Sequence, residues 1–206
     1  MSQVTLYCGP MKSDKSSRLI QTGLRLIKQK KSFLSFKPTL DTRNPNVIWT
    51  RDPHLPSLEC IQVKTPLQIL NFLPELPPVI KDTHNPSSYN QEIFSLDSIL
   101  LDEVFMWDSS LFQVLDILKN RQIDVYIASL DRDYRGYYFP LTDYEEKRKS
   151  ISDLMEYADK VYILKGTCEK CGNLGDRTWR STPKSEQILV DESIYEVRCE
   201  PCHRLD

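Results

Sequence analysis

An eight-residue segment between a predicted strand and a predicted helix constrains the fold most strongly. Residues 9–16 read Gly-Pro-Met-Lys-Ser-Asp-Lys-Ser. Before them, apolar residues alternate over residues 4–8, which predicts a short strand, and the apolar spacing from Lys15 to Ile27 predicts a helix. Residues 33–36 predict a second strand. A strand, a tight turn, a helix and a further strand make a βαβ unit, which is the start of a parallel sheet.

The same segment occupies the place of a Walker A loop, whose pattern GxxxxGK[ST] cradles phosphates on backbone N–H groups at a helix N-terminus. Gly9 begins the pattern. Lys15 is placed to reach the terminal phosphates, and the hydroxyl of Ser16 is placed to ligate Mg²⁺. Because the glycine before Lys15 is missing, an ordinary strand-to-helix turn remains an alternative interpretation.

Asp14 stands where the pattern has its second glycine. Glycine there lets the backbone approach phosphates closely and adopts conformations that are costly for a residue with Cβ. Asp14 also adds a negative charge beside an anionic ligand, and two like charges ~4 Å apart at an effective dielectric near 20 repel by about 4 kcal/mol. Lys12 is a cation that offsets part of this repulsion. Weak or absent ATP binding is therefore an alternative to be tested.

A second motif follows the apolar residues 98–101, which predict a strand. Asp102 and Glu103 come directly after it, and ligands bind at this edge of an open parallel sheet. The pattern is that of a Walker B strand, in which Asp102 holds Mg²⁺ through water and Glu103 accepts a proton as a general base. A solvated strand end is the alternative.

Four cysteines near the C-terminus form two Cys-x-x-Cys pairs, Cys168 with Cys171 and Cys199 with Cys202. Two thiolates that flank a two-residue turn can share one tetrahedral Zn²⁺, so the spacing predicts a structural zinc site. Four unrelated reduced thiols are the alternative. His203 is a candidate to replace Cys202, although Cys202 keeps the spacer of the first pair.

The remainder of the chain predicts an α/β fold, with a P-loop NTPase-like parallel sheet flanked by helices and a small C-terminal zinc-ribbon or lasso domain. The composition changes beyond Lys165, which predicts domains 1–165 and 166–206. Residues 52–97 are Pro-rich and predict a surface loop with a brief helix at 67–73. Further predicted elements are helices at 109–119 and 144–157 and core strands at 125–130 and 161–164.

Composition excludes several classes of protein. The 206 residues are 40% hydrophobic and 27% charged, which is typical of a globular chain and not of a disordered one. A net charge of −2 does not favour a general nucleic-acid binder, so a zinc ribbon that contacts nucleic acid is a minor interpretation. No apolar run approaches a membrane span and no signal peptide is visible. We therefore expect a cytoplasmic protein with neither a membrane nor a nucleic acid as partner.

Taken together, these motifs resemble the type II thymidine kinase family over nearly the whole chain. The likeness is weakest over residues 52–97. The residues that carry it are Gly9-Pro10-Met11, Lys15-Ser16, Phe36–Arg43, Asp102-Glu103, Leu130–Gly136, Phe139, the two cysteine pairs, Arg177-Thr178 and Tyr195.

The resemblance implies ATP-dependent, Mg²⁺-requiring phosphorylation of the 5′-hydroxyl of thymidine, with deoxyuridine tolerated. It implies that Glu103 is the catalytic base and that the protein is a homo-tetramer or a dimer. By match to the family, the residues for ATP and Mg²⁺ are Gly9, Lys15, Ser16, Asp41, Arg43 and Asp102. Those for the nucleoside are Met11, Met106, Leu130, Tyr134, Phe139, Thr178 and Tyr195.

Departures from the family pattern cluster at the expected ligand-binding loops. Besides Asp14, the family's Asp-Glu-x-Gln-Phe-Phe run has Phe105 in place of Gln and Met106 in place of the ring that covers the nucleoside. Val190 and Asp191 stand where the family has paired glycines. A catalytically impaired pseudokinase that keeps the fold and the zinc site is therefore the alternative to an active kinase.

Overall fold

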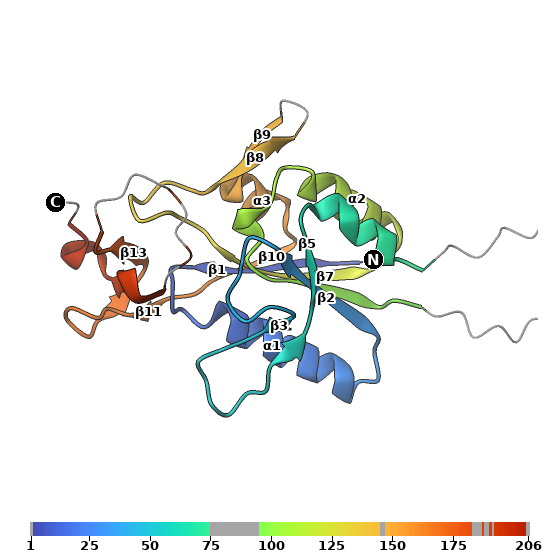
Figure 1. The fold of residues 1–206 in the computed structure, drawn as a ribbon, viewed down its shortest axis with the longest axis horizontal. Coiled ribbons are helices and arrows are strands. Elements are labelled where there is room, and N and C mark those ends of the chain that lie inside the picture. The colour runs from blue at the N-terminus through green and yellow to red at the C-terminus, as the bar shows by residue number, and fades with distance from the viewer. Residues whose placement is uncertain are drawn as a thin grey trace, which may run out of the picture.

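The computed structural model describes residues 2–74, 95–144, 147–182, 187, 190 and 192–204. Its centre is a six-stranded sheet in the order β10-β1-β7-β6-β2-β5, in which every neighbouring pair is parallel. This arrangement confirms the predicted α/β fold (Figure 1). The strands are β1 (Val4–Gly9), β2 (Phe33–Pro38), β5 (Ile61–Val63), β6 (Ser98–Leu101), β7 (Asp124–Leu130) and β10 (Lys160–Ile163).

Helices cover both faces of the sheet. Helix α1 (Lys15–Lys28) lies on one face, while α2 (Leu111–Asn120) and α3 (Ile151–Tyr157) lie on the other (Figure 1). Successive side chains of a strand point to opposite faces, and strand β6 shows the result. Leu100 packs in the α1-side cluster, whereas Ile99 and Leu101 pack in the cluster that contains α2. A parallel sheet buried on both faces is thus the reason for the unbroken apolar run before Asp102.

The predicted helix at 144–157 is wrong in its first half. Strands β8 (Pro140–Tyr144) and β9 (Lys147–Ser150) form an antiparallel hairpin there, and only Ile151–Tyr157 is helical. Ser150 and Asp153 form a capping box, which sets the helix start. The buried residues Ile151 and Leu154 lie after this cap, so the apolar face that packs against the core begins with the helix itself.

Two further expectations are corrected. Within the predicted loop at 52–97, residues 61–63 form β5 of the main sheet, and β4 (Leu58–Glu59) pairs with β3 (Val47–Ile48). The predicted brief helix is the 3₁₀ helix η1 (Pro66–Phe72), and residues 75–94 lie outside the described residues. Strand β10 exists but is not a core strand, because it lies at the sheet edge with Tyr162 49% and Ile163 59% exposed.

The C-terminal segment builds two small antiparallel sheets beside the carboxyl ends of the main strands (Figure 1). They are β11 (Gly166–Thr167) with β12 (Leu174–Gly175), and β13 (Arg177–Arg180) with β14 (Tyr195–Arg198). Short 3₁₀ helices complete the described chain, namely η2 (Val104–Met106), η3 (Glu192–Ile194) and η4 (Glu200–Cys202). Among the described residues, no helix has the length and apolar character needed to cross a bilayer.

Candidate functional site

The loop between β1 and α1 takes the strained conformation that its sequence predicts. Asp14 has φ 61° and ψ 22°, in the left-handed region, and is the N-cap of α1. Its side chain is exposed and makes no capping hydrogen bond. A residue with Cβ costs roughly 1–2 kcal/mol there, and less for Asp or Asn. The position is therefore one that favours glycine, and Asp14 is tolerated rather than preferred.

Lys15 is buried beneath this loop. Its Nζ donates to the Pro10 carbonyl oxygen and lies 3.4 Å from Ser13 Oγ. Burial lowers the pKa of the Lys15 ammonium, although the carboxylate of Glu103 acts in the opposite direction. The ammonium thus lies inside the turn. Gly9 has a packing role, since a Cβ there would lie 2.3 Å from the Leu164 carbonyl oxygen.

Ser16 and Asp102 meet at the carboxyl ends of β1 and β6. Ser16 Oγ lies 3.3 Å from Asp102 Oδ1, although the two residues are 86 positions apart in the chain. Burial, followed by the charge of Glu103, raises the pKa of Asp102 to about 7. A divalent cation at this point would stabilise the charged carboxylate. A hydroxyl and a carboxylate are the oxygen ligands that Mg²⁺ prefers, so the pair fits the predicted Mg²⁺ site.

Asp41, Arg43 and Glu103 form a continuous network of ion pairs. Arg43 Nε lies 2.7 Å from Asp41 Oδ1, and Arg43 Nη2 lies 2.8 Å from Glu103 Oε1. Burial would raise the pKa of Asp41, but hydrogen bonds from Arg43 and Lys37 outweigh it and hold that pKa below its ordinary value. The Asp41 carboxylate therefore keeps its charge next to the guanidinium, and the same guanidinium orients the Glu103 side chain through the contact at Oε1.

Glu103 itself is held in an unusual backbone conformation, with φ 54°. Its Oε2 is buried and has no hydrogen-bond partner among the described residues. An unpartnered carboxylate oxygen in a buried position costs free energy, and such atoms occur where a ligand or a proton is expected. The chemistry available to Oε2 is acceptance of a proton from a hydroxyl that enters the site.

All seven residues predicted for the nucleoside line one pocket. Beyond Met11, Met106, Leu130, Tyr134, Phe139, Thr178 and Tyr195, its lining includes Phe105 and Val190. The rings of Phe105 and Phe139 lie 4.6 Å apart, and the guanidinium of Arg180 lies 3.7 Å from the Tyr134 ring centroid. Flat rings with a few polar groups are typical of a site for a planar heterocycle.

This aromatic pocket adjoins the pocket of the phosphate loop. The second pocket is lined by Lys15, Ser16, Asp41, Asp102 and Glu103, and the two pockets share Met11 and Arg43. Gly9 lines neither of them. The backbone N–H of Met11 donates to Thr178 Oγ1 at 3.0 Å, so the C-terminal segment closes directly onto the loop. The molecule therefore combines a pocket lined by charged side chains and an aromatic pocket, with the Glu103 carboxylate beside their junction.

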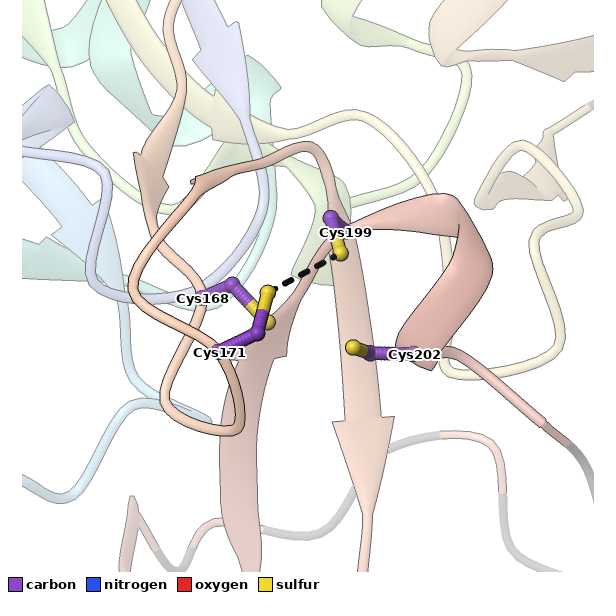
Figure 2. Close-up of side chains that lie close together, drawn as sticks. All are labelled: Cys168, Cys171, Cys199 and Cys202. Carbon is purple, nitrogen blue, oxygen red and sulfur yellow. Dashed lines mark hydrogen bonds between the residues drawn. The ribbon is translucent and has the colours of Figure 1, made fainter.

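The four paired cysteines converge, as Figure 2 shows. Their Sγ atoms all lie within 4.8 Å of one another, and those of Cys171 and Cys199 are 3.5 Å apart. Four thiolates on a tetrahedral Zn²⁺ with Zn–S bonds of about 2.3 Å lie roughly 3.8 Å from one another, so the cluster fits zinc. His203 is engaged elsewhere, because its Nε2 lies 2.9 Å from the Tyr134 carbonyl oxygen.

Comparison with known proteins agrees with this geometry. The model of one protein family, thymidine kinase, matches residues 2–203. The chain belongs to the thymidine kinase family. A thymidine kinase of Mycoplasma genitalium is 28% identical over 202 residues, which cover 96% of this chain and 81% of the relative. A thymidine kinase of Bacteroides thetaiotaomicron is 27% identical over 203 residues, with 98% and 86% covered. The protein is accordingly a kinase, a phosphotransferase with a nucleoside kinase function.

Within this thymidine kinase fold, sequence reasoning missed Lys37 and Asp133 as parts of the site. Lys37 is buried, and its Nζ lies 2.8 Å from Asp41 Oδ2 and 2.9 Å from the Arg43 carbonyl oxygen. It therefore braces the loop that carries Asp41 and Arg43. Asp133 accepts hydrogen bonds from Arg135 and Gln187 at the nucleoside pocket. A lysine inside the apolar strand Phe33–Pro38 was the available signal for the first of these.

The departures from the thymidine kinase pattern lie where the sequence suggested. Phe105, Met106 and Val190 line the nucleoside pocket, and Asp14 lines the phosphate pocket. Asp191 lies outside the described residues. The substitutions thus change the walls of both pockets, while the residues that join them are the expected ones.

Proposed function

We propose that this protein transfers the γ-phosphoryl group of ATP to the 5′-hydroxyl of thymidine, with deoxyuridine as a second acceptor. The observation that carries the proposal is the junction of the two pockets at Met11 and Arg43, beside the unpartnered oxygen of Glu103. A phosphate donor and a nucleoside that enter from opposite sides meet at this carboxylate. The chemistry therefore needs no large rearrangement of the sheet.

On the donor side, the proposed phosphate ligands are the loop N–H groups and Lys15. Ser16 and Asp102 would hold Mg²⁺, which neutralises phosphate charge when it is bound. Arg43 lies between the pockets and carries a fixed positive charge, because the carboxylates of Glu103 and Asp41 raise its pKa against the effect of burial. Charge that develops on the transferred group is thus stabilised by groups that are already in place.

On the acceptor side, the base would lie among the rings of the aromatic pocket, with Thr178 and Tyr195 at its C-terminal wall. In the reaction, the 5′-oxygen forms a bond to the γ-phosphorus while the bond from that phosphorus to the β–γ bridging oxygen breaks. The hydroxyl proton passes to Glu103 Oε2, and ADP leaves. The proposal thus assigns Glu103 the role of the base and zinc, at the four cysteines, that of a structural ion.

The proposal predicts that purified protein with ATP, Mg²⁺ and thymidine forms thymidine monophosphate and ADP in equal amounts. Thymidine at about 100 times its Kd should stabilise the fold by about 2.7 kcal/mol, which raises the Tm of a domain of this size by roughly 5–10 °C. Chromatographic product analysis and a thermal-shift titration measure the two effects. Failure to phosphorylate thymidine, deoxyuridine or other nucleosides contradicts the proposal.

Asp14→Gly is predicted to lower the Kd for ATP at least tenfold. The change removes both a carboxylate near the phosphates and the Cβ of a residue in the left-handed region. Asp14→Asn is the matched control, because it removes the charge but keeps Cβ. Calorimetric titration then separates the two causes, since an equal gain in both variants assigns the effect to charge. Unchanged affinity in both variants would contradict the electrostatic argument.

A further inference from the structure

Lys12 is a cation of the phosphate loop that the Walker A pattern does not contain. It lies two residues before Asp14 and, like Asp14, has a positive φ, here 55°. Its side chain lines the phosphate pocket together with Lys15 and Ser16. Its Nζ lies 3.0 Å from Glu169 Oε1 and 3.1 Å from Glu169 Oε2, so both carboxylate oxygens accept from it.

Glu169 belongs to the first cysteine pair, between Cys168 and Cys171, and is anchored independently of Lys12. Its Oε1 accepts the N–H of Val197 at 2.9 Å, and its own N–H donates to the Val197 carbonyl oxygen at 2.8 Å. The side chains of Lys12 and Glu169 are 28% and 40% exposed. An ion pair this exposed is weak, so Lys12 can change its partner at a small cost in free energy. Glu169 would meanwhile stay hydrogen-bonded to Val197 of β14.

The other charges around the phosphate pocket explain why a second cation is useful. Lys37 is committed to Asp41 in a buried ion pair, and the half-buried guanidinium of Arg43 is shared with Asp41 and Glu103. Asp14 adds a carboxylate to the lining that the usual loop lacks. A triphosphate brings several negative charges of its own, and a polyanion attracts a lysine more strongly than one carboxylate does.

We propose that Lys12 is a second phosphate-binding cation, which leaves Glu169 for the donor phosphates when ATP binds and so compensates for Asp14. The proposal rests on the proposed function, because it assigns a residue to the donor site. Under this proposal, Glu169 and the donor phosphates compete for the ammonium group of Lys12.

The two partners give opposite expected results, which separates this proposal from a simple structural brace. Lys12→Ala should weaken ATP and tripolyphosphate binding about tenfold. Glu169→Gln should tighten both several-fold, because glutamine keeps an acceptor for the Val197 N–H but holds Lys12 less strongly. In the Lys12→Ala background, Glu169→Gln should have no effect. Lys170→Ala, which removes an exposed positive charge from the same cysteine pair, is the matched control and should change neither affinity.

Calorimetric titration of the full-length, zinc-loaded protein measures these affinities. Weaker ATP binding in both Lys12→Ala and Glu169→Gln would overturn the proposal and assign the ion pair a bracing role. Normal ATP binding by Lys12→Ala would overturn it too, while leaving the proposed kinase function intact. Absence of ATP binding by the wild type and by Asp14→Gly would instead contradict the proposed function, and this inference with it.

Discussion

Glu103→Gln is expected to lower kcat for thymidine phosphorylation by about 10³-fold, within the range that general-base catalysis usually contributes. Glutamine has the same shape, and its amide oxygen can still accept from Arg43 Nη2, which lies 2.8 Å from Glu103 Oε1. The amide nitrogen takes the place of the buried, unpartnered Oε2 and cannot accept the hydroxyl proton. Steady-state kinetics with ATP and thymidine measures the loss.

The control for this variant is Asp97→Asn. Asp97 precedes strand β6 and Glu103 follows it, so the two acids stand at opposite ends of the same strand. Asp97 accepts the Ser32 N–H at 2.8 Å, far from either pocket. Its neutralisation should cost stability of about 1–3 kcal/mol and leave kcat near the wild-type value.

Binding measurements distinguish lost chemistry from lost structure in Glu103→Gln. If Glu103 acts as the base, the Kd values for ATP and thymidine should stay within a few-fold of those of the wild type. A variant that keeps more than a tenth of the wild-type kcat would show that another group takes the proton. Asp102 would be the first candidate, because burial raises its pKa to about 7 and makes it a stronger base than an ordinary carboxylate.

The parts of the site that sequence predicted are those determined by local pattern and by sheet geometry. The loop before Lys15 and the acids after β6 were each visible as short motifs. Ser16 and Asp102 were both assigned to Mg²⁺ at the carboxyl edge of the parallel sheet, and their side chains lie 3.3 Å apart. Each cysteine pair is a compact turn of fixed spacing, and the predicted sharing of one metal ion by both pairs agrees with the convergence of the four Sγ atoms.

What sequence could not predict depends on contacts between distant segments. Nothing local to residues 61–63 distinguishes strand β5 from the surrounding Pro-rich chain, and it is a strand because β2 offers it an edge. Tertiary context also determines the structure of residues 147–150, a charged stretch compatible with a helix that instead pairs as strand β9 with β8. The apolar β10 was predicted to be buried, but its place in the strand order leaves it at the edge.

The sequence likewise could not predict that the two pockets adjoin. The hydrogen bond from Met11 N–H to Thr178 Oγ1 spans 167 positions of the chain. Family resemblance supplied the residues of the nucleoside site without the contacts that bring them together. Lys37 shows the opposite case, in which a charge within an apolar strand was visible but its partner Asp41 was four residues away in a loop. The ion pair of Lys37 and Asp41 holds the loop in place because both side chains are buried. Their burial depends on the whole fold and cannot be predicted from the local sequence.

Removal of zinc is expected to disable the nucleoside pocket while leaving the main sheet folded. Cys199 directly follows β14, the strand in which Tyr195 lines the nucleoside pocket and pairs with Arg180. Structural zinc in small domains contributes on the order of 10 kcal/mol to folding. Without it, the two-stranded sheets β11–β12 and β13–β14 depend on few buried apolar side chains among the described residues, such as Tyr195 and Val197. Cys199→Ser should therefore abolish zinc binding, lower the temperature at which these short sheets unfold by about 20–40 °C and raise the KM for thymidine at least tenfold.

Cys60→Ser is the matched control, because Cys60 is also buried and lies outside the cysteine cluster. It should keep one zinc per chain and a KM for thymidine close to that of the wild type, with a modest loss of stability. Metal analysis, thermal unfolding and kinetics report the three properties separately. Treatment of the wild type with a strong chelator should reproduce the Cys199→Ser result. A zinc-free protein with an unchanged KM would show that β13 and β14 hold Thr178 and Tyr195 in place without the metal, because their pairing alone would then position the pocket wall.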